Sequence, residues 1–357
     1  MTISIQLPEK TKMKILVLTP TYFPLITGNA VTTHRITTEI SQSGASCKII
    51  DLSQKMDTDL LDETVLFSPD IIHCFHAYKA GRKGLLLKKK LRIPLITTIT
   101  GTDVYIDLKD REKRRVILNV LEGSDRITVF NDSSLSRLVQ YGIPKEKVHI
   151  IHQSVRMGKE EKINYRLLHG IMDNEVIFLM IGGIRPVKRI RYVIDVLTRL
   201  QKTHPHIRLF LAGSILEKEE YEKIEKKIRV HPWVTYLGQV QRKHIPSLYR
   251  SVNAVINASS SESEANGLLE ALYFRKLIIA RKITGNSSFL SDQTALLFHT
   301  KKDLYERVQS VSERQVEAAA FYRITDQLMQ TTFSNDAETE GYWSVYRQLF
   351  HNFTSSA

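Results

Sequence analysis

The chain alternates short apolar runs with longer stretches of helical spacing. In the first half, the apolar runs that predict strands lie at 14–19, 46–52, 71–75, 95–100 and 126–130. Positions 32–43 have the spacing of an amphipathic helix, and a helix after the last run would be capped by Asn131 or Asp132. Strands that alternate with helices in this way predict a parallel sheet covered on both faces.

The same alternation starts again after about residue 156. The strands predicted for this second half lie at 176–181, 207–212, 234–237, 254–257 and 277–280. The predicted helices lie at 189–200, 217–229, about 245–250 and 267–274, and helical segments at 310–330 and 342–353 close the chain. The sequence therefore predicts an α/β protein with two doubly wound, Rossmann-like domains, 1–156 and 157–335, and a C-terminal helix within 336–357. The polar stretch 157–165 is the predicted linker.

Length and composition agree with two globular domains. A chain of 357 residues is too long for one ordinary core, and 42% hydrophobic with 25% charged residues is typical of folded proteins. Two cysteines, Cys47 and Cys74, are too few for a disulfide framework and fit a reducing compartment. Since no apolar run approaches the length of a membrane span, we expect a soluble, cytoplasmic protein.

The net charge of +13 is unevenly distributed. The segment 79–92 contains seven basic residues and no acidic one. Leu85 and its neighbours among these lysines predict a basic amphipathic helix that could rest on an anionic membrane surface. An equally good interpretation is a solvated helix whose leucines join the core. Nucleic acid is not an expected partner, because no aromatic platform or reading helix accompanies the charge.

The segment 259–272 carries the strongest functional signal. It follows an apolar run and places Glu262 and Glu270 eight positions apart, roughly on one helical face. Asn266 and Gly267 stand where a strand should give way to a helix, so backbone N–H groups there can face an anion. A carboxylate two turns into the helix can accept hydrogen bonds from ribose hydroxyls. The alternative is that the acids merely enrich a first helical turn, which the helix dipole favours.

A second phosphate-binding pattern lies at 181–188, after a predicted strand. Gly183 permits close backbone approach, while Arg185 and Lys188 are cations suited to a diphosphate. An ordinary turn between strand and helix needs a glycine but not two cations. Together with the segment 259–272, this pattern predicts a site for a sugar joined to a diphosphate.

Three loops of the first half should meet the same cleft, because ligands bind at the carboxyl ends of parallel strands. Gly28 and Asn29 follow the first strand and could present N–H groups to the phosphate, or simply form a turn and a helix cap. Asp103 follows the fourth strand and could bind sugar hydroxyls or cap the next helix. His76 ends the third strand and is a more probable cleft residue than His73.

Two further patterns concern the nucleotide and a metal. Val240 follows a predicted strand and could present backbone groups to a base. Asp57 and Asp59 match the Asp-x-Asp pattern of some metal-dependent enzymes, but they precede two leucines in a capping context. We therefore expect no metal and no cofactor, with the cations of 181–188 neutralising the diphosphate instead.

Taken together, these motifs resemble the retaining glycosyltransferases of the GT-B fold, glycosyltransferase family 4, from about residue 13 to 350. The spacing Glu262-x7-Glu270 matches that family's signature. Within the family, the loop at 27–31, Gly101–Val104 and the segment 185–188 are most similar to glycosyltransferase-1-domain-containing proteins. Selenosugar synthases, which use a small anionic acceptor, are similar at 100–103 and 285–286.

The resemblance implies roles for these residues. Glu270 would hold the donor ribose, Glu262 would lie beside the transferred sugar, and Arg185 with Lys188 would bind the diphosphate. Asp103 is counted with Glu262, Arg185 and Lys188 as a candidate catalytic residue. The C-terminal helix would cross back onto the first, acceptor-side domain.

The implied reaction is transfer of a sugar from a nucleoside diphosphate, most simply UDP, with retention, to an unknown glycan, lipid or small molecule. The departing phosphate would help to deprotonate the acceptor. Two positions depart from the family pattern: Thr100 replaces the usual histidine and Gly183 the usual arginine. A sugar-nucleotide-binding protein without turnover, and a selenosugar-synthase-like enzyme, are therefore the alternatives.

Overall fold

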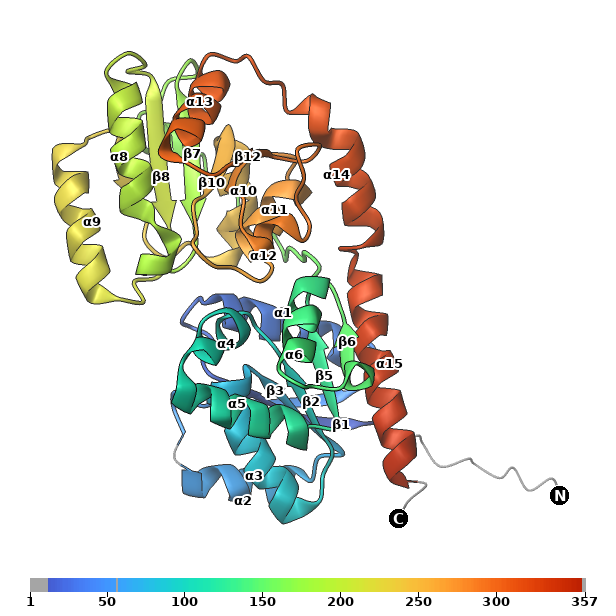
Figure 1. The fold of residues 1–357 in the computed structure, drawn as a ribbon. Coiled ribbons are helices and arrows are strands. Elements are labelled where there is room, and N and C mark those ends of the chain that lie inside the picture. Colours follow the sequence, from blue (N-terminus) through green and yellow to red (C-terminus); the bar gives the residue numbers. More distant parts are fainter. Residues whose placement is uncertain (1–11, 56, 355–357) are drawn as a thin grey trace.

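The computed structural model describes residues 12–55 and 57–354 and contains two six-stranded parallel sheets, one in each half of the chain (Figure 1). The strand orders are β2-β1-β3-β4-β5-β6 and β12-β11-β10-β7-β8-β9. In each sheet the order reverses beside the half's first strand, so helices cover both faces. The prediction of two doubly wound, Rossmann-like units is confirmed.

The N-terminal unit begins at Lys14. Its strands are β1 (Lys14–Thr19), β2 (Ser46–Asp51), β3 (Ile71–Phe75), β4 (Leu95–Thr98), β5 (Arg126–Val129) and β6 (Val148–Ile150). Its α-helices are α1 (Gly28–Gln42), α2 (Asp57–Phe67), α3 (Arg82–Leu91), α4 (Thr102–Tyr105), α5 (Arg111–Gly123) and α6 (Asp132–Gln140). A π-helix, η1 (Ala77–Gly81), and two short 3₁₀ turns, η2 (Asp107–Lys109) and η3 (Lys145–Lys147), complete it. The predicted cap of α6 is Asn131, whose side chain accepts from the Ser134 N–H.

The C-terminal unit follows an irregular stretch at 151–164 that contains most of the predicted linker. Its strands are β7 (Val176–Ile181), β8 (Ile207–Ala212), β9 (Val234–Tyr236), β10 (Ala254–Asn257), β11 (Leu277–Arg281) and β12 (Leu296–Phe298). Its α-helices are α7 (Tyr165–Leu168), α8 (Ile190–Gln201), α9 (Lys218–Val230), α10 (Ile245–Ser251), α11 (Asn266–Tyr273), α12 (Thr284–Ser287) and α13 (Lys301–Ser312). Two 3₁₀ turns, η4 (Pro186–Lys188) and η5 (Arg242–His244), precede α8 and α10.

Local hydrogen bonds explain where the predicted boundaries are wrong. The strand predicted to reach Thr100 ends at Thr98, because the Thr100 and Gly101 N–H groups turn to the Asp103 carboxylate. The helix predicted from position 32 begins at Gly28, because the Thr27 hydroxyl accepts from the Ala30 N–H and caps it.

The C-terminal end crosses from one unit to the other. The single helix predicted at 310–330 is wrong, since the helical chain is interrupted between Ser312 and Ala319. After α14 (Ala319–Thr331), α15 (Asn335–Thr354) runs along the N-terminal unit (Figure 1). Tyr342 and Tyr346 of α15 are buried in the same core cluster as Val17 of β1. The last helix therefore completes the core of the first unit.

The basic segment 79–92 spans the end of η1 and α3. Leu85 and Leu87 are buried in the core, whereas Leu86 is 59% exposed. The interpretation that places the leucines in the core thus holds for Leu85 and Leu87 but not for Leu86. Contact of this segment with a membrane stays a prediction. Within residues 12–55 and 57–354, no helix combines the length and apolar character that a membrane span requires.

Candidate functional site

A cavity of about 430 Å³ lies where the carboxyl ends of the two sheets face each other. Its N-terminal wall includes Thr21, Gly28, Asn29, His76, Lys79, Thr100, Thr102 and Gln153. Its C-terminal wall includes Gly182, Gly183, Arg185, Lys188, Glu262, Asn266 and Gly267. A smaller cavity of about 100 Å³ continues from it, sharing Gly28, Gly182, Gly183, Asn266 and Gly267, and ends at Val240 and Glu270. One continuous cleft thus joins most of the predicted site residues.

The turn after β7 lets the chain approach a ligand closely. Gly182 has a φ of +137°, which favours glycine, and a side chain on Gly183 would collide with Leu216. Gly183 therefore stands where an arginine would not fit in this backbone. Arg185 lines the cleft two residues on, and its Nε atom is buried without a hydrogen-bond partner in the described part of the chain. Such an unsatisfied donor is what a bound phosphate would satisfy.

Lys188 and Glu262 form a pair across the cavity floor. The Lys188 Nζ atom lies 2.5 Å from the Glu262 Oε1 atom. Burial alone would raise the pKa of Glu262, but Lys188, with Ser259 and Arg185, lowers it, so the carboxylate is charged at neutral pH. Because α11 begins at Asn266, Glu262 precedes the helix, and the prediction that both acids share one helical face is wrong.

The start of α11 faces the cleft without a side-chain cap. Its N-cap residue, Ala265, offers no side-chain acceptor, and the Leu268 N–H donates to the Ala265 carbonyl at 2.8 Å. The N–H groups of Asn266 and Gly267 are therefore the ones that this helix start can offer to an anion. A Cβ atom on Gly267 would lie 2.6 Å from Ile181, so a larger residue would push the helix away from the turn after β7. The chain thus brings together the two elements that were predicted to bind an anion.

Glu270 occupies the smaller cavity, as expected of a group that could grip a ribose. Its carboxylate pairs with Arg242 of η5 and accepts a 3.0 Å hydrogen bond from the Tyr249 hydroxyl. Val240 lines the same cavity. Sequence reasoning missed Arg242, because no motif links a 3₁₀ turn to a helix 28 residues later.

Gly28 and Asn29 lie at the start of α1, opposite α11. The Asn266 side-chain amide lies 3.4 Å from the Gly28 carbonyl oxygen and 3.2 Å from the Thr32 hydroxyl. The first turn of α1 therefore contacts the start of α11 directly, and both helix starts border the larger cavity.

Asp103 does not lie in the cleft, contrary to the prediction of a sugar-binding role. It is fully buried, and its carboxylate accepts hydrogen bonds from the backbone N–H groups of Ala77 (3.0 Å) and Gly101 (2.8 Å). It therefore fixes the turns after β3 and β4, which carry His76 and Thr100. His73 is also structural: its ring bonds to Tyr346 and Thr98.

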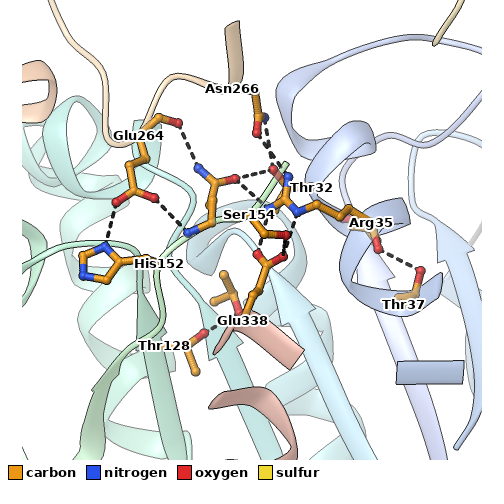
Figure 2. Close-up of polar contacts among 12 residues, drawn as sticks. Thr32, Arg35, Thr37, Thr128, His152, Ser154, Glu264, Asn266 and Glu338 are labelled. Carbon is orange, nitrogen blue, oxygen red and sulfur yellow. Dashed lines mark hydrogen bonds and ion pairs between the residues drawn. The ribbon is translucent and has the colours of Figure 1, made fainter. Parts of the chain in front are cut away.

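A buried polar network links the two units behind the cleft (Figure 2). The Glu264 carboxylate contacts the His152 Nδ1 atom at 3.0 Å and the Gln153 N–H at 3.0 Å. Arg35 of α1 pairs with Glu338 of α15 at 2.8 Å and donates to the Asn266 side chain at 3.2 Å. Sequence reasoning gave no signal for Arg35 and Glu338, which lie 303 positions apart.

Burial and pairing shift the charges of this network. The hydrogen bond that the His152 ring makes to the Glu264 carboxylate raises the pKa of His152, and burial raises the pKa of Glu264. Both shifts favour a shared proton at the junction between the units.

The described residues contain no cluster of three or more metal-ligating side chains. The side chain of Asp57 lies outside the described part of the structure. The expectation of a metal-independent reaction stays a prediction.

Two Rossmann-like units that face each other across a cleft define a GT-B architecture. Residues 14–157 match the model of Glycosyltransferase Family 4, and residues 162–326 match the model of glycosyl transferases group 1. Together the two matches cover most of both units. The chain belongs to the GT-B glycosyltransferases.

Individual relatives agree with this assignment. Glycosyltransferase 1 domain-containing protein 1 of Xenopus tropicalis is 26% identical over 78% of this chain and 82% of its own length. Anabaena Alr3699/HepE, solved in complex with UDP and glucose, has a similar fold (TM-score 0.80, 17% identity, 94% of this chain and 100% of that chain). Sucrose-phosphate synthase from Thermosynechococcus elongatus gives a TM-score of 0.79 at 15% identity, over 96% of this chain and 100% of that chain.

Proposed function

We propose that this protein transfers a sugar from a UDP-linked donor to an acceptor hydroxyl with retention of configuration and without a metal ion. One observation carries the proposal: two cationic side chains, an uncapped helix start and a buried glutamate surround one continuous cleft. The two cations and the helix start suit a diphosphate, and the buried glutamate suits the hydroxyls of a ribose. The complex of Alr3699/HepE with UDP and glucose adds support for the donor class.

The donor would lie along the cleft with its nucleoside in the smaller cavity and its sugar in the larger one. Glu270 would accept hydrogen bonds from the ribose hydroxyls, displacing part of its contact with Arg242. Arg185, Lys188 and the start of α11 would hold the diphosphate. Glu262, charged beside Lys188, would accept from the sugar hydroxyls.

The chemical step breaks the bond between the sugar's anomeric carbon and the phosphate oxygen. Negative charge then builds on that oxygen, and fixed cations and N–H groups stabilise it better than water does because they need no reorganisation. The acceptor oxygen bonds to the anomeric carbon from the same face, and its proton passes to the departing phosphate oxygen. This route needs no carboxylate nucleophile on the opposite face of the sugar.

Nucleotide release from UDP-sugars by the purified protein tests the proposal. Glu270→Ala removes a charged hydrogen-bond partner, a loss of about 1.5–3 kcal/mol, so donor KM should rise about 10- to 100-fold. Glu222→Ala on α9, whose side chain is 56% exposed, is the matched control and should behave like the wild type.

Binding without turnover is the main alternative, and Thr100 at the cleft, where the family has histidine, favours it. In that case UDP-sugars would raise the melting temperature but no nucleotide would be released. A ligand at about 100 times its Kd adds about 2.7 kcal/mol of stability. Absence of both effects would contradict the proposal altogether.

A further inference from the structure

The N-terminal wall of the cleft contains a distorted segment that the donor leaves unused. We propose that the acceptor carries an anionic group, a phosphate or a carboxylate, and that Lys79 binds it together with the hydroxyls of Thr100 and Thr102. This inference rests on the proposed function and names the acceptor class for it.

The backbone around Lys79 is unusual. His76 has a φ of +84°, a backbone conformation that residues other than glycine rarely adopt. It directly precedes the π-helix η1. Strained residues and single-turn π-helices are retained mainly where function requires them. Here the distortion brings both His76 and Lys79 to the cavity lining, directly after β3.

His76 contributes a second polar group to this corner. Its Nδ1 atom accepts a 3.3 Å hydrogen bond from the Lys79 N–H, so the proton of the neutral ring lies on Nε2. Burial lowers the pKa of His76, which keeps the ring neutral. Its Nε2 atom is buried without a hydrogen-bond partner among the described residues. The nearest carboxylate, Asp107, lies 3.7 Å away and is paired with Lys113 at 2.9 Å.

The charges of the two walls indicate which ligand belongs where. On the described N-terminal wall, Lys79 is a cation and no lining residue is a carboxylate, since Asp103 is turned to backbone N–H groups. On the opposite wall, Arg185 and Lys188 would be occupied by the donor diphosphate. Lys79, which is exposed, is then the cation left for the acceptor.

The outer surface beside η1 continues this positive character. The Arg82 guanidinium and the Lys113 ammonium lie over the Tyr78 ring at 5.5 and 5.6 Å from its centre. Clustered cations at a cleft raise the local concentration of anions and their rate of association. Lys113 is also paired with Asp107, so Arg82 supplies most of the added positive charge beside η1 and favours an anionic over a cationic acceptor.

Binding of inorganic phosphate to protein already saturated with UDP tests the subsite, because UDP covers the donor cations. Calorimetry should detect a phosphate site in the UDP complex. Lys79→Ala should weaken it about 10- to 100-fold, since a charged hydrogen bond is lost. Lys79→Arg should restore most of the affinity. Lys90→Ala, the same charge change at an exposed position of α3, should leave it unaltered.

Failure of the subsite and failure of the proposed function are distinguishable. If UDP binds but phosphate does not, or binds equally to Lys79→Ala, the subsite proposal is overturned while the donor site stands. If UDP itself does not bind, the proposed function fails first.

Two acceptor series then identify the source of the anionic group. Glycerol 3-phosphate is compared with glycerol, and vesicles containing phosphatidylglycerol with vesicles of phosphatidylcholine, by the nucleotide release that each stimulates. Stimulation by the soluble phosphate alone indicates a small acceptor, and stimulation by the anionic vesicles alone indicates a lipid. Preference for the neutral member of both pairs would contradict the proposal.

Discussion

The two walls of the cleft consist of similar strand–turn–helix units that use their charged residues differently. In the C-terminal unit, Lys188 and Glu262 border the cavity and keep 15% and 11% of their side-chain surfaces exposed. In the N-terminal unit, Arg35 and Glu338 are 6% and 2% exposed. Asp103 is fully buried, and its carboxylate accepts hydrogen bonds from backbone N–H groups and lies 3.9 Å from the His76 Nδ1 atom. The C-terminal pair therefore borders the cavity, where a ligand could reach it. The charged groups named in the N-terminal unit are instead buried against partners within the protein.

This difference separates two kinds of substitution. A charged residue of the donor wall should affect turnover more than stability, because its partner can be solvated from the cavity. A buried charge behind the acceptor wall should affect stability first, because its partner would be left without compensation. The following substitutions test whether that separation holds.

The largest effect is expected for Arg35→Ala. It leaves the Glu338 carboxylate buried and unpaired, which costs about 3–5 kcal/mol of folding free energy. Urea denaturation measures the loss. Arg347→Ala, on the helix α15 that also carries Glu338, breaks an exposed pair. Arg347 and its partner Glu340 are 55% and 67% exposed, so the loss should be about 1 kcal/mol or less. Equal losses in the two variants would show that burial does not distinguish these pairs.

Lys188→Ala should instead reduce turnover. Loss of one charge-stabilising donor typically costs about 100- to 1,000-fold in kcat, or about 2.7–4 kcal/mol of activation free energy. Steady-state kinetics with a UDP-sugar measures this, with Lys218→Ala, 87% exposed on α9, as the control. A variant that melts far below the wild type but turns over normally would reverse the comparison between the walls.

Gly285→Ala tests how firmly the donor wall must be supported. A Cβ atom at Gly285 would overlap the Glu262 carbonyl, so the segment carrying that acid must move. We expect a stability loss of about 1–3 kcal/mol together with weaker donor binding. Calorimetric titration of UDP measures the second effect. Gly158→Ala adds a methyl with no atom within 4 Å and should change neither quantity.

The smallest effect concerns the junction between the walls. Because Glu264 raises the pKa of His152 above its usual 6.5, the folded state binds the proton more tightly than the unfolded state. The resulting stabilisation is complete below about pH 6.5 and is lost as pH rises through the raised pKa. The Tm advantage of the wild type over His152→Gln should therefore shrink as pH rises from about 6.5 through the raised pKa. An advantage independent of pH would show that the proton plays no part.

The sequence was sufficient where local pattern and function coincide. Five-residue apolar runs such as Ile71–Phe75 predict buried parallel strands, because both faces of such strands must be covered. Glycines and cations directly after a strand predict a phosphate turn. The structure places Gly183, Arg185 and Lys188 at the cleft, and phosphate binding there stays a prediction. Both inferences depend on residues that are neighbours in the chain.

The sequence was not sufficient where residues far apart in the chain meet. Asp103 follows a strand, as a cleft residue would. Its carboxylate instead accepts hydrogen bonds from backbone N–H groups of two turns. The interruption between α13 and α14 was missed, as was the contact of Arg242 with Glu270.

The chain by itself thus determined its two-sheet architecture and indicated the cations that line the C-terminal wall of the cleft, since strand burial and turn chemistry are set by short-range sequence. Only the tertiary structure decided which charged side chains face the cleft and which are paired with other groups of the protein behind it. The reason is physical: a side chain's role depends on whether a partner occupies its hydrogen-bonding groups. For Arg35 that partner, Glu338, comes from a helix 303 positions away.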